Sequence, residues 1–122
     1  MFDCDGVIAD SEAHWNEIDR VHLSHYGVAD YDGRYKENVI GKSFILSETF
    51  YKDIFGIDNP VAEMMEHRTG VATQFYSEII PTFEGVAEVL LKLKSMNLKL
   101  ALATSSVSAL ILPFLKRHDI EK

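Results

Sequence analysis

Residues 2–12 read FDCDGVIADSE, and this stretch carries most of the information in the chain. Asp3 and Asp5 are separated by one small residue, lie at the end of an apolar segment and are followed at once by glycine. Alternate side chains of an extended strand share a face, so we expect Asp3 and Asp5 to project together while Cys4 points the other way. Gly6 allows the backbone to turn sharply away beside any group that the two acids bind.

The spacing of these two acids points to cation and phosphate chemistry. Two carboxylates this close repel each other unless a divalent cation lies between them or one of them keeps a proton. Oxygen ligands suit Mg²⁺, which usually keeps several waters and binds through one or two carboxylates plus a substrate phosphate. One acid could attack phosphorus and form an aspartyl phosphate, while the other protonates the leaving oxygen and then activates water.

FDCDGVIADSE resembles the first signature of the haloacid dehalogenase-like (HAD) phosphohydrolase superfamily, an apolar strand that ends in Asp-x-Asp-Gly. The resemblance implies that Asp3 is the nucleophile and Asp5 the general acid and base. It also implies magnesium at Asp3 and Asp5, bound by the side chain of the first and the backbone carbonyl of the second. The run from Val7 to Glu12 resembles the phosphoglycolate phosphatase and β-phosphoglucomutase branch, in which a helical cap is inserted directly after this loop.

A second motif lies at residues 98–106, LKLALATSS. Its alternating leucines and small apolar residues predict a strand buried on both faces between helices. It is similar to the second HAD signature, a strand that ends in a Thr or Ser bonded to phosphate. The resemblance implies that Thr104 and the backbone amides of Ser105 and Ser106 bind the phosphoryl group, together with the turn at Gly6. The alternative interpretation is that these hydroxyl residues only cap a helix.

The stretch between the two motifs has the periodicity of helices. A first helix is predicted to have Ser11 or Asp10 as its cap and to stop at Gly27, and a second is predicted to stop at Gly56. A third is predicted to have Asn59 as its cap and Pro60 at its first helical position.

Pro81 closes the third helix, so an all-helical insertion is predicted over residues 12–80. This insertion has the size and place of the family's helical cap. Residues 1–11 and 81–122 are then predicted to form a partial HAD-like core.

After Pro81 the pattern alternates between helix and strand. Residues 86–96 predict a core-facing helix, Asn97 a left-handed turn, and residues 107–119 a last helix that Pro113 kinks or delays. A helix followed by a buried strand is typical of a parallel doubly wound sheet. The predicted fold class is therefore α/β: a partial, Rossmann-like doubly wound sheet with an inserted all-helical cap, helix-rich overall.

One cap loop is a candidate substrate contact. Related caps present a flexible loop with a basic or polar residue to the active site at the place of Gly41, Lys42 and Ser43, and Lys42 could bind a second anionic group. The alternative is an ordinary solvated lysine. Many relatives carry a histidine where this chain has Trp15, and His14 lies one position early.

The remaining polar residues of the helical stretch predict no site. The histidines other than His14 lack the spacing of a zinc site and are expected to be surface or half-buried residues: His22, His25, His67 and His118. The charged groups expected to form solvated helix faces are Asp19, Arg20, Glu63, Glu66, His67 and Arg68.

Composition excludes some classes of function. The chain has 122 residues, 47% of them hydrophobic, and a net charge of −7, without a cluster of Lys and Arg that could follow a nucleic-acid backbone. Its apolar runs are too short to span a bilayer, and it has neither region of a signal peptide, so a cytoplasmic location is expected. The single cysteine, Cys4, is expected to be a packed thiol.

Two further HAD signatures, a lysine and an acidic pair that completes the magnesium site, would lie beyond Lys122. Lys116 lies well inside a predicted helix and does not replace the lysine. The predicted function is hydrolysis of a phosphate monoester of a small phosphorylated metabolite with Mg²⁺, with this chain alone weakly active or inactive. The alternatives are a sugar-phosphate mutase of the same superfamily, a phospho-acceptor module resembling a response-regulator receiver, and a non-catalytic fragment or interaction domain.

Overall fold

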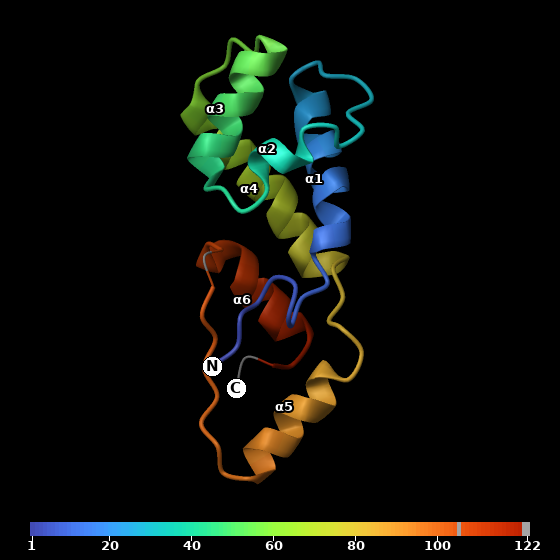
Figure 1. Ribbon diagram of the computed structural model, residues 1–122, viewed down its shortest axis with the longest axis vertical. Helices are drawn as coiled ribbons and strands as arrows, with labels where there is room; N and C mark the ends of the chain where they lie inside the picture. Colours follow the sequence, from blue (N-terminus) through green and yellow to red (C-terminus); the bar gives the residue numbers. More distant parts are fainter. Residues whose placement is uncertain (105, 121–122) are drawn as a thin grey trace. The chain divides into compact units, whose positions relative to one another are not determined.

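A computed structural model describes residues 1–104 and 106–120. Its helices, in chain order, are α1 (Glu12–His25), α2 (Lys36–Val39), α3 (Phe44–Phe55), α4 (Val61–Glu78), α5 (Val86–Ser95) and α6 (Ser108–Arg117) (Figure 1). The chain divides into two compact units: a terminal unit, Met1–His14 with Thr73–Lys122, and a middle unit, Trp15–Ala72. Helices α1 and α4 contribute residues to both units. Within the described residues, no helix is both long enough and apolar enough to cross a membrane.

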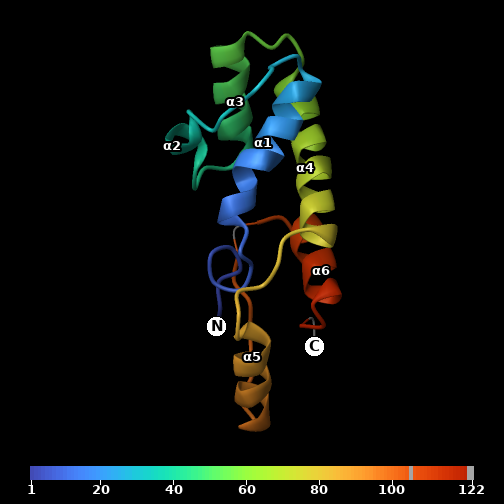
Figure 2. The ribbon, with the colours of Figure 1, turned by 90° about the vertical axis from the view of Figure 1, so that its right-hand side faces the viewer.

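The middle unit is helical, and glycines end its helices as predicted. α1 ends at His25, just before Gly27, whose φ of 83° is left-handed. α3 ends at Gly56 with φ 63°, and the Gly56 N–H donates to the carbonyl of Lys52. Such a backbone favours glycine because a Cβ would crowd it. The core of this unit, whose helices include α1, α3 and α4 as labelled in Figure 2, consists of Leu23, Tyr31, Val39, Tyr51, Ile57 and Met64.

The start of α4 differs slightly from the prediction. The helix begins at Val61, and Pro60 precedes it and accepts the N–H of Met64 at 3.1 Å. The Asn59 side chain contacts Glu63 instead (Nδ2 to Oε2, 3.3 Å). Pro60 is therefore the residue that flanks the helix, because its carbonyl can accept a helical hydrogen bond although it has no N–H to donate.

The expectation that Asp19 and Arg68 lie on solvated helix faces is wrong. Asp19 is 5% exposed and Arg68 4% exposed, and they form an ion pair in which Arg68 donates to both Asp19 oxygens, at 2.9 and 3.2 Å. His22, expected at the surface or half-buried, is completely buried beside Glu48. The opposite charges of Asp19 and Arg68, which lie on different helices, satisfy one another, and this allows both groups to leave water. Arg20 and Glu66 are exposed as expected.

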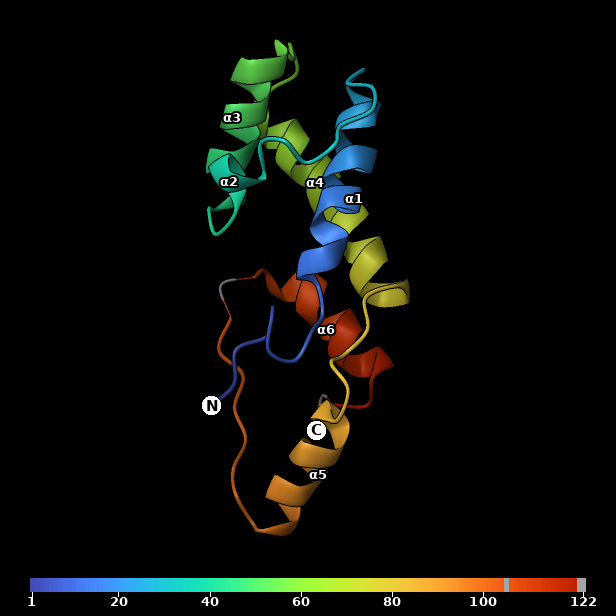
Figure 3. The same cartoon turned by 45° about the vertical axis from the view of Figure 1, so that its right-hand side comes forward.

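The terminal unit does not contain the predicted doubly wound sheet within its described residues. Phe2 and Leu102 form one parallel bridge, through hydrogen bonds of Phe2 N–H to Ala101 O and of Ala103 N–H to Phe2 O, each 2.8 Å. Figure 3 shows the N-terminal segment beside the segment that follows α5. Residues 98–104 were predicted as a strand buried on both faces, but Leu98 is 50% exposed. The pairing stops because the backbone bends at Cys4. Backbone hydrogen bonds between two strands continue only while the two segments run side by side.

The last two helices also differ in part from the prediction. α5 buries none of its residues, and Leu91 is 67% exposed, so it is not the core-facing helix that its pattern predicts. Asn97 is left-handed as predicted, with φ 59°. α6 begins at Ser108 and continues through Pro113, so its start is not delayed. Its buried residues are Leu110, Ile111 and Phe114.

Candidate active site

The acidic loop is a tight turn closed by backbone hydrogen bonds. The carbonyl of Cys4 accepts the N–H groups of Ile8 and Ala9, each at 2.9 Å, and the Gly6 N–H donates to Ala9 O at 3.0 Å. Gly6 has φ 78°, and a Cβ built there would meet nothing within 4 Å, so the backbone conformation and not the available space favours glycine. The predicted turn at Gly6 is therefore present.

The side chains of the loop differ in their exposure to solvent. Cys4 is completely buried, Asp3 is exposed and Asp5 is half-buried. Asp3 Oδ1 accepts the N–H of Cys4 at 2.7 Å. Burial, together with the charges of Asp5 and then Asp3, raises the pKa of the Cys4 thiol to about 12. Cys4 is thus a neutral packed thiol, as expected.

Three hydroxyl groups surround the Asp5 carboxylate. Ser11 donates to Oδ1 at 2.7 Å, Tyr76 donates to the same oxygen, and Ser106 donates to Oδ2 at 2.6 Å. The donors come from the start of α1, the end of α4 and the segment before α6, so the tertiary fold fixes the orientation of this carboxylate.

Sequence reasoning assigned none of these three donors to Asp5. Ser11 was assigned only to the start of a helix, and Ser106 to an amide contact with phosphate. Tyr76 falls within the insertion predicted over residues 12–80; it is completely buried, and its ring packs edge-on against that of Phe114 with 6.0 Å between the centroids. The available signal was that a buried tyrosine hydroxyl usually needs a hydrogen-bond partner.

Thr104 makes a local contact that does not cap α6. Its Oγ1 accepts the N–H of Ser106 at 3.1 Å, and Val107 is the residue that flanks α6. Ser105, the other predicted phosphate contact, lies outside the described residues. Lys42 belongs to the middle unit, where it is exposed in the loop between α2 and α3. The hydroxyl of Ser106, through its contact with Asp5, connects the second motif to the first.

The donor set fits magnesium bound through few protein ligands. No group of three or more His, Cys, Asp and Glu side chains gathers anywhere among residues 1–104 and 106–120. Mg²⁺ needs only one or two carboxylates when waters and a substrate phosphate complete its octahedron. Asp3 faces solvent and could serve as such a ligand, whereas the Asp5 side-chain oxygens already accept three hydroxyl hydrogens.

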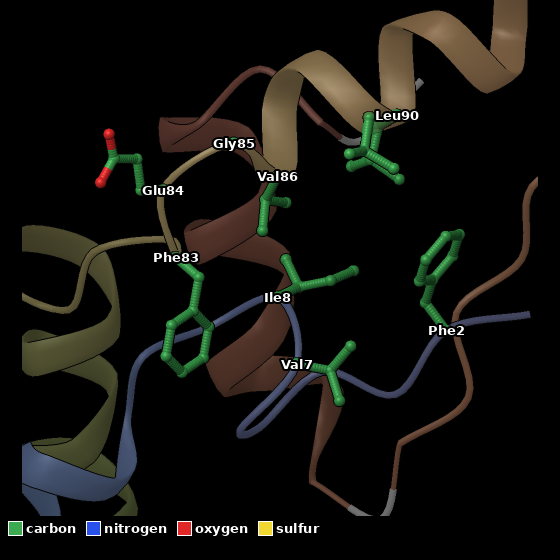
Figure 4. A pocket seen from close by; sticks show the side chains of 9 residues that line it. Phe2, Val7, Ile8, Phe83, Glu84, Gly85, Val86 and Leu90 are labelled. Atoms are coloured by element: carbon green, nitrogen blue, oxygen red, sulfur yellow. The ribbon is translucent and has the colours of Figure 1, made fainter.

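Two clefts of the terminal unit are not lined by these acids. One, of about 300 Å³, is lined mainly by apolar side chains, among them Phe2, Ile8, Phe83 and Val86 (Figure 4). Neither Asp3 nor Asp5 lines it, and the Glu84 carboxylate points away from the apolar side chains (Figure 4). This cleft is therefore not part of the candidate active site.

The sequence model of the haloacid dehalogenase-like hydrolase family matches residues 1–122. The chain belongs to this family. Among curated proteins, no sequence matches it.

Several solved structures resemble this chain. A putative β-phosphoglucomutase from Thermotoga maritima is 28% identical with a TM-score of 0.81, and the match covers 98% of this chain and 55% of that one. CbbY from Rhodobacter sphaeroides, in complex with phosphate, is 19% identical with a TM-score of 0.77, covering 95% and 54%. A HAD family hydrolase from Deinococcus radiodurans R1, with bound phosphate and sodium, is 19% identical with a TM-score of 0.62, covering 98% and 52%. The chain thus spans about half the length of these relatives.

Proposed function

We propose that this HAD-family chain takes part in the hydrolysis of a phosphate monoester of a small metabolite, through a phosphorylated Asp3. The observation that carries the proposal is the arrangement of the two acids on one turn. Asp3 is exposed and can approach a substrate, whereas three hydroxyls orient Asp5. A nucleophile needs access and a general acid needs orientation, so the two environments suit the two roles.

The proposed reaction has two steps. An Asp3 oxygen attacks phosphorus, the bond from phosphorus to the ester oxygen breaks, and protonated Asp5 gives its proton to that oxygen. Asp5 then takes a proton from a water molecule, whose oxygen attacks the same phosphorus; the bond to Asp3 breaks and inorganic phosphate leaves. Magnesium, when bound beside Asp3, would neutralise charge on the transferring phosphoryl group.

The proposal extends to residues whose roles rest on the family resemblance. Gly6, Thr104 and Ser105 would bind the phosphoryl group, and Lys42 a second anionic group of the substrate. The middle unit would belong to a helical cap inserted over residues 12–80. Its helices, joined to the terminal unit through α1 and α4, support this assignment.

A sugar-phosphate mutase is the second candidate. The observation that favours it is the 28% identity with a structure described as a putative β-phosphoglucomutase, against 19% for CbbY and for the Deinococcus hydrolase. A mutase returns the phosphoryl group to another oxygen of the sugar, whereas a phosphatase releases it to water. Product analysis with a sugar phosphate distinguishes isomerisation from phosphate release.

Covalent labelling tests the proposal even when turnover by this chain is weak. The purified chain is incubated with Mg²⁺ and acetyl phosphate, and intact-mass and peptide analysis locate any added phosphoryl group. We expect the label on Asp3, none in Asp3→Asn, and a longer-lived label in Asp5→Asn, because the base that activates water is then missing. Asp10→Asn, which changes a half-buried acid just after the turn, is the matched control and should label normally. A chain without label, or with label elsewhere, contradicts Asp3 as the nucleophile.

A further inference from the structure

The middle unit contains three histidines stacked in a row. His67, on α4, lies between His25 and His22, which are both on α1. The ring centroids of His25 and His67 are 4.0 Å apart with 15° between their planes, and those of His22 and His67 are 5.0 Å apart with 26°. The proposed phosphatase chemistry uses none of these residues.

Both ring nitrogens of His22 are engaged. Nε2 lies 2.7 Å from Glu48 Oε2, and Nδ1 lies 2.8 Å from Nδ1 of His67. His22 and Glu48 are completely buried. An ionised carboxylate can only accept, so Nε2 of His22 carries a hydrogen.

The contact between the two Nδ1 atoms limits how many protons the His22–His67 pair can bind. Two nitrogen atoms 2.8 Å apart leave room for only one hydrogen between them. Two neutral imidazoles satisfy this condition, and so does one imidazole with one imidazolium. Two imidazolium ions would place two hydrogens on the same line, so the contact would break. Separated histidines have no such limit.

Charge around the pair imposes the same limit. The titratable and charged side chains nearby are Asp19, His25 and Tyr26 on α1, Glu48 and Tyr51 on α3, and Glu63 and Arg68 on α4. Among the buried ones, Asp19 and Glu48 share the single guanidinium of Arg68, with Glu48 Oε1 3.5 Å from Arg68 Nε. One imidazolium balances the remaining negative charge, and a second one is uncompensated. Burial, then the positive charges of His25 and His22, lowers the pKa of His67.

We propose that the histidine row makes the middle unit acid-sensitive: the folded His22–His67 pair binds at most one added proton, and acidification separates α1 from α4. The unfolded chain binds more protons than the folded one below the ordinary histidine pKa of about 6.5. The free energy of unfolding therefore has its full value above that pH and decreases as the pH falls below it. For each excluded proton, the unfolding equilibrium constant rises about tenfold per pH unit.

Urea unfolding between about pH 7 and about pH 5 tests this proposal, because free histidine titrates within that range. Trp15, the single tryptophan of the chain, packs against Phe44 in the middle unit and reports its unfolding by fluorescence. In His67→Asn the amide can keep a polar contact but cannot bind a second proton. For each pH unit of acidification, we expect the unfolding equilibrium constant of this variant to rise by a factor about ten times smaller than that of the wild type. His14→Asn, a half-buried histidine outside this unit, should keep the wild-type dependence.

Histidine NMR of the wild-type chain decides the question if His67→Asn does not fold. The ring Cε1–H signals of His22 and His67 are followed as the pH falls. We expect only one of the two to become charged before the signals of the unfolded chain appear. Two imidazolium rings in the folded unit, or equal pH dependence in wild type and His67→Asn, would overturn the proposal.

Discussion

Tyr76 donates its hydroxyl hydrogen to Oδ1 of Asp5, although 71 positions separate the two residues. The contact joins the end of α4 to the acidic turn, and Ser11 donates to the same oxygen. A carboxylate that accepts hydrogens from several segments keeps one orientation only while those segments stay packed. The candidate acid and base is therefore positioned by the tertiary fold of the terminal unit.

Removing this hydroxyl should destabilise the chain. We expect Tyr76→Phe to lower the free energy of unfolding by about 1.5 kcal/mol, the value of a hydrogen bond to a charged group. Packing of the ring against Phe114 is retained. Urea denaturation measures the change. Tyr35→Phe, which removes a tyrosine hydroxyl from the middle unit, is the control; an equal effect of the two substitutions would show that the Asp5 contact contributes nothing.

The buried ion pair of the middle unit should be worth far more than an exposed one. Arg68→Met leaves the Asp19 carboxylate buried without its cation, and we expect a loss of about 3–5 kcal/mol in the free energy of unfolding. The matched substitution Arg20→Met removes an exposed pair with Glu17, which should cost less than about 1 kcal/mol. Chemical denaturation of both variants compares them. Similar losses would mean that Arg68 is not buried in solution.

Cys4 should react slowly with thiol reagents while the chain is folded. Its pKa of about 12 leaves almost no thiolate at neutral pH, whereas an unfolded thiol has a pKa near 8.5. We expect alkylation by iodoacetamide to be at least about a hundredfold slower in buffer than in urea. Because folding raises this pKa, the stabilising effect of the neutral thiol is present below about pH 8.5 and is lost as the pH rises toward 12. Rapid alkylation of the folded chain would contradict the buried position.

Gly70→Ala and Gly56→Ala should change the stability of the chain in opposite directions. Gly70 lies inside α4 with nothing within 4 Å of an added Cβ, so Gly70→Ala should stabilise the chain by about 0.5–1 kcal/mol. Gly56 ends α3 at φ 63°, so Gly56→Ala should destabilise it by about 1 kcal/mol. Thermal unfolding of the two variants gives the signs. A stabilising Gly56→Ala would show that α3 does not end in a left-handed residue.

Features that depend on neighbouring residues were predictable from the sequence. The acidic turn, the helix ends at Gly27 and Gly56 and the left-handed Asn97 all follow from local backbone preferences, which need no distant partner. Membership of the HAD family was predictable for the same reason, because its first signature is contiguous. The pattern of residues 98–104 was misleading, since alternation describes a strand but not whether neighbouring chain covers it.

Contacts between distant segments were decided by the tertiary structure. Arg68 follows Met64 and precedes Ala72 on one buried stripe of α4, which was the available signal for its burial, but its partner Asp19 lies 49 positions earlier. The hydrogen bond from Tyr76 to Asp5 likewise depends on the packing of the end of α4 against the acidic turn. Amino-acid order determines which groups are present and how the nearby backbone bends. Packing alone determines which charges lose their water and which partner replaces it.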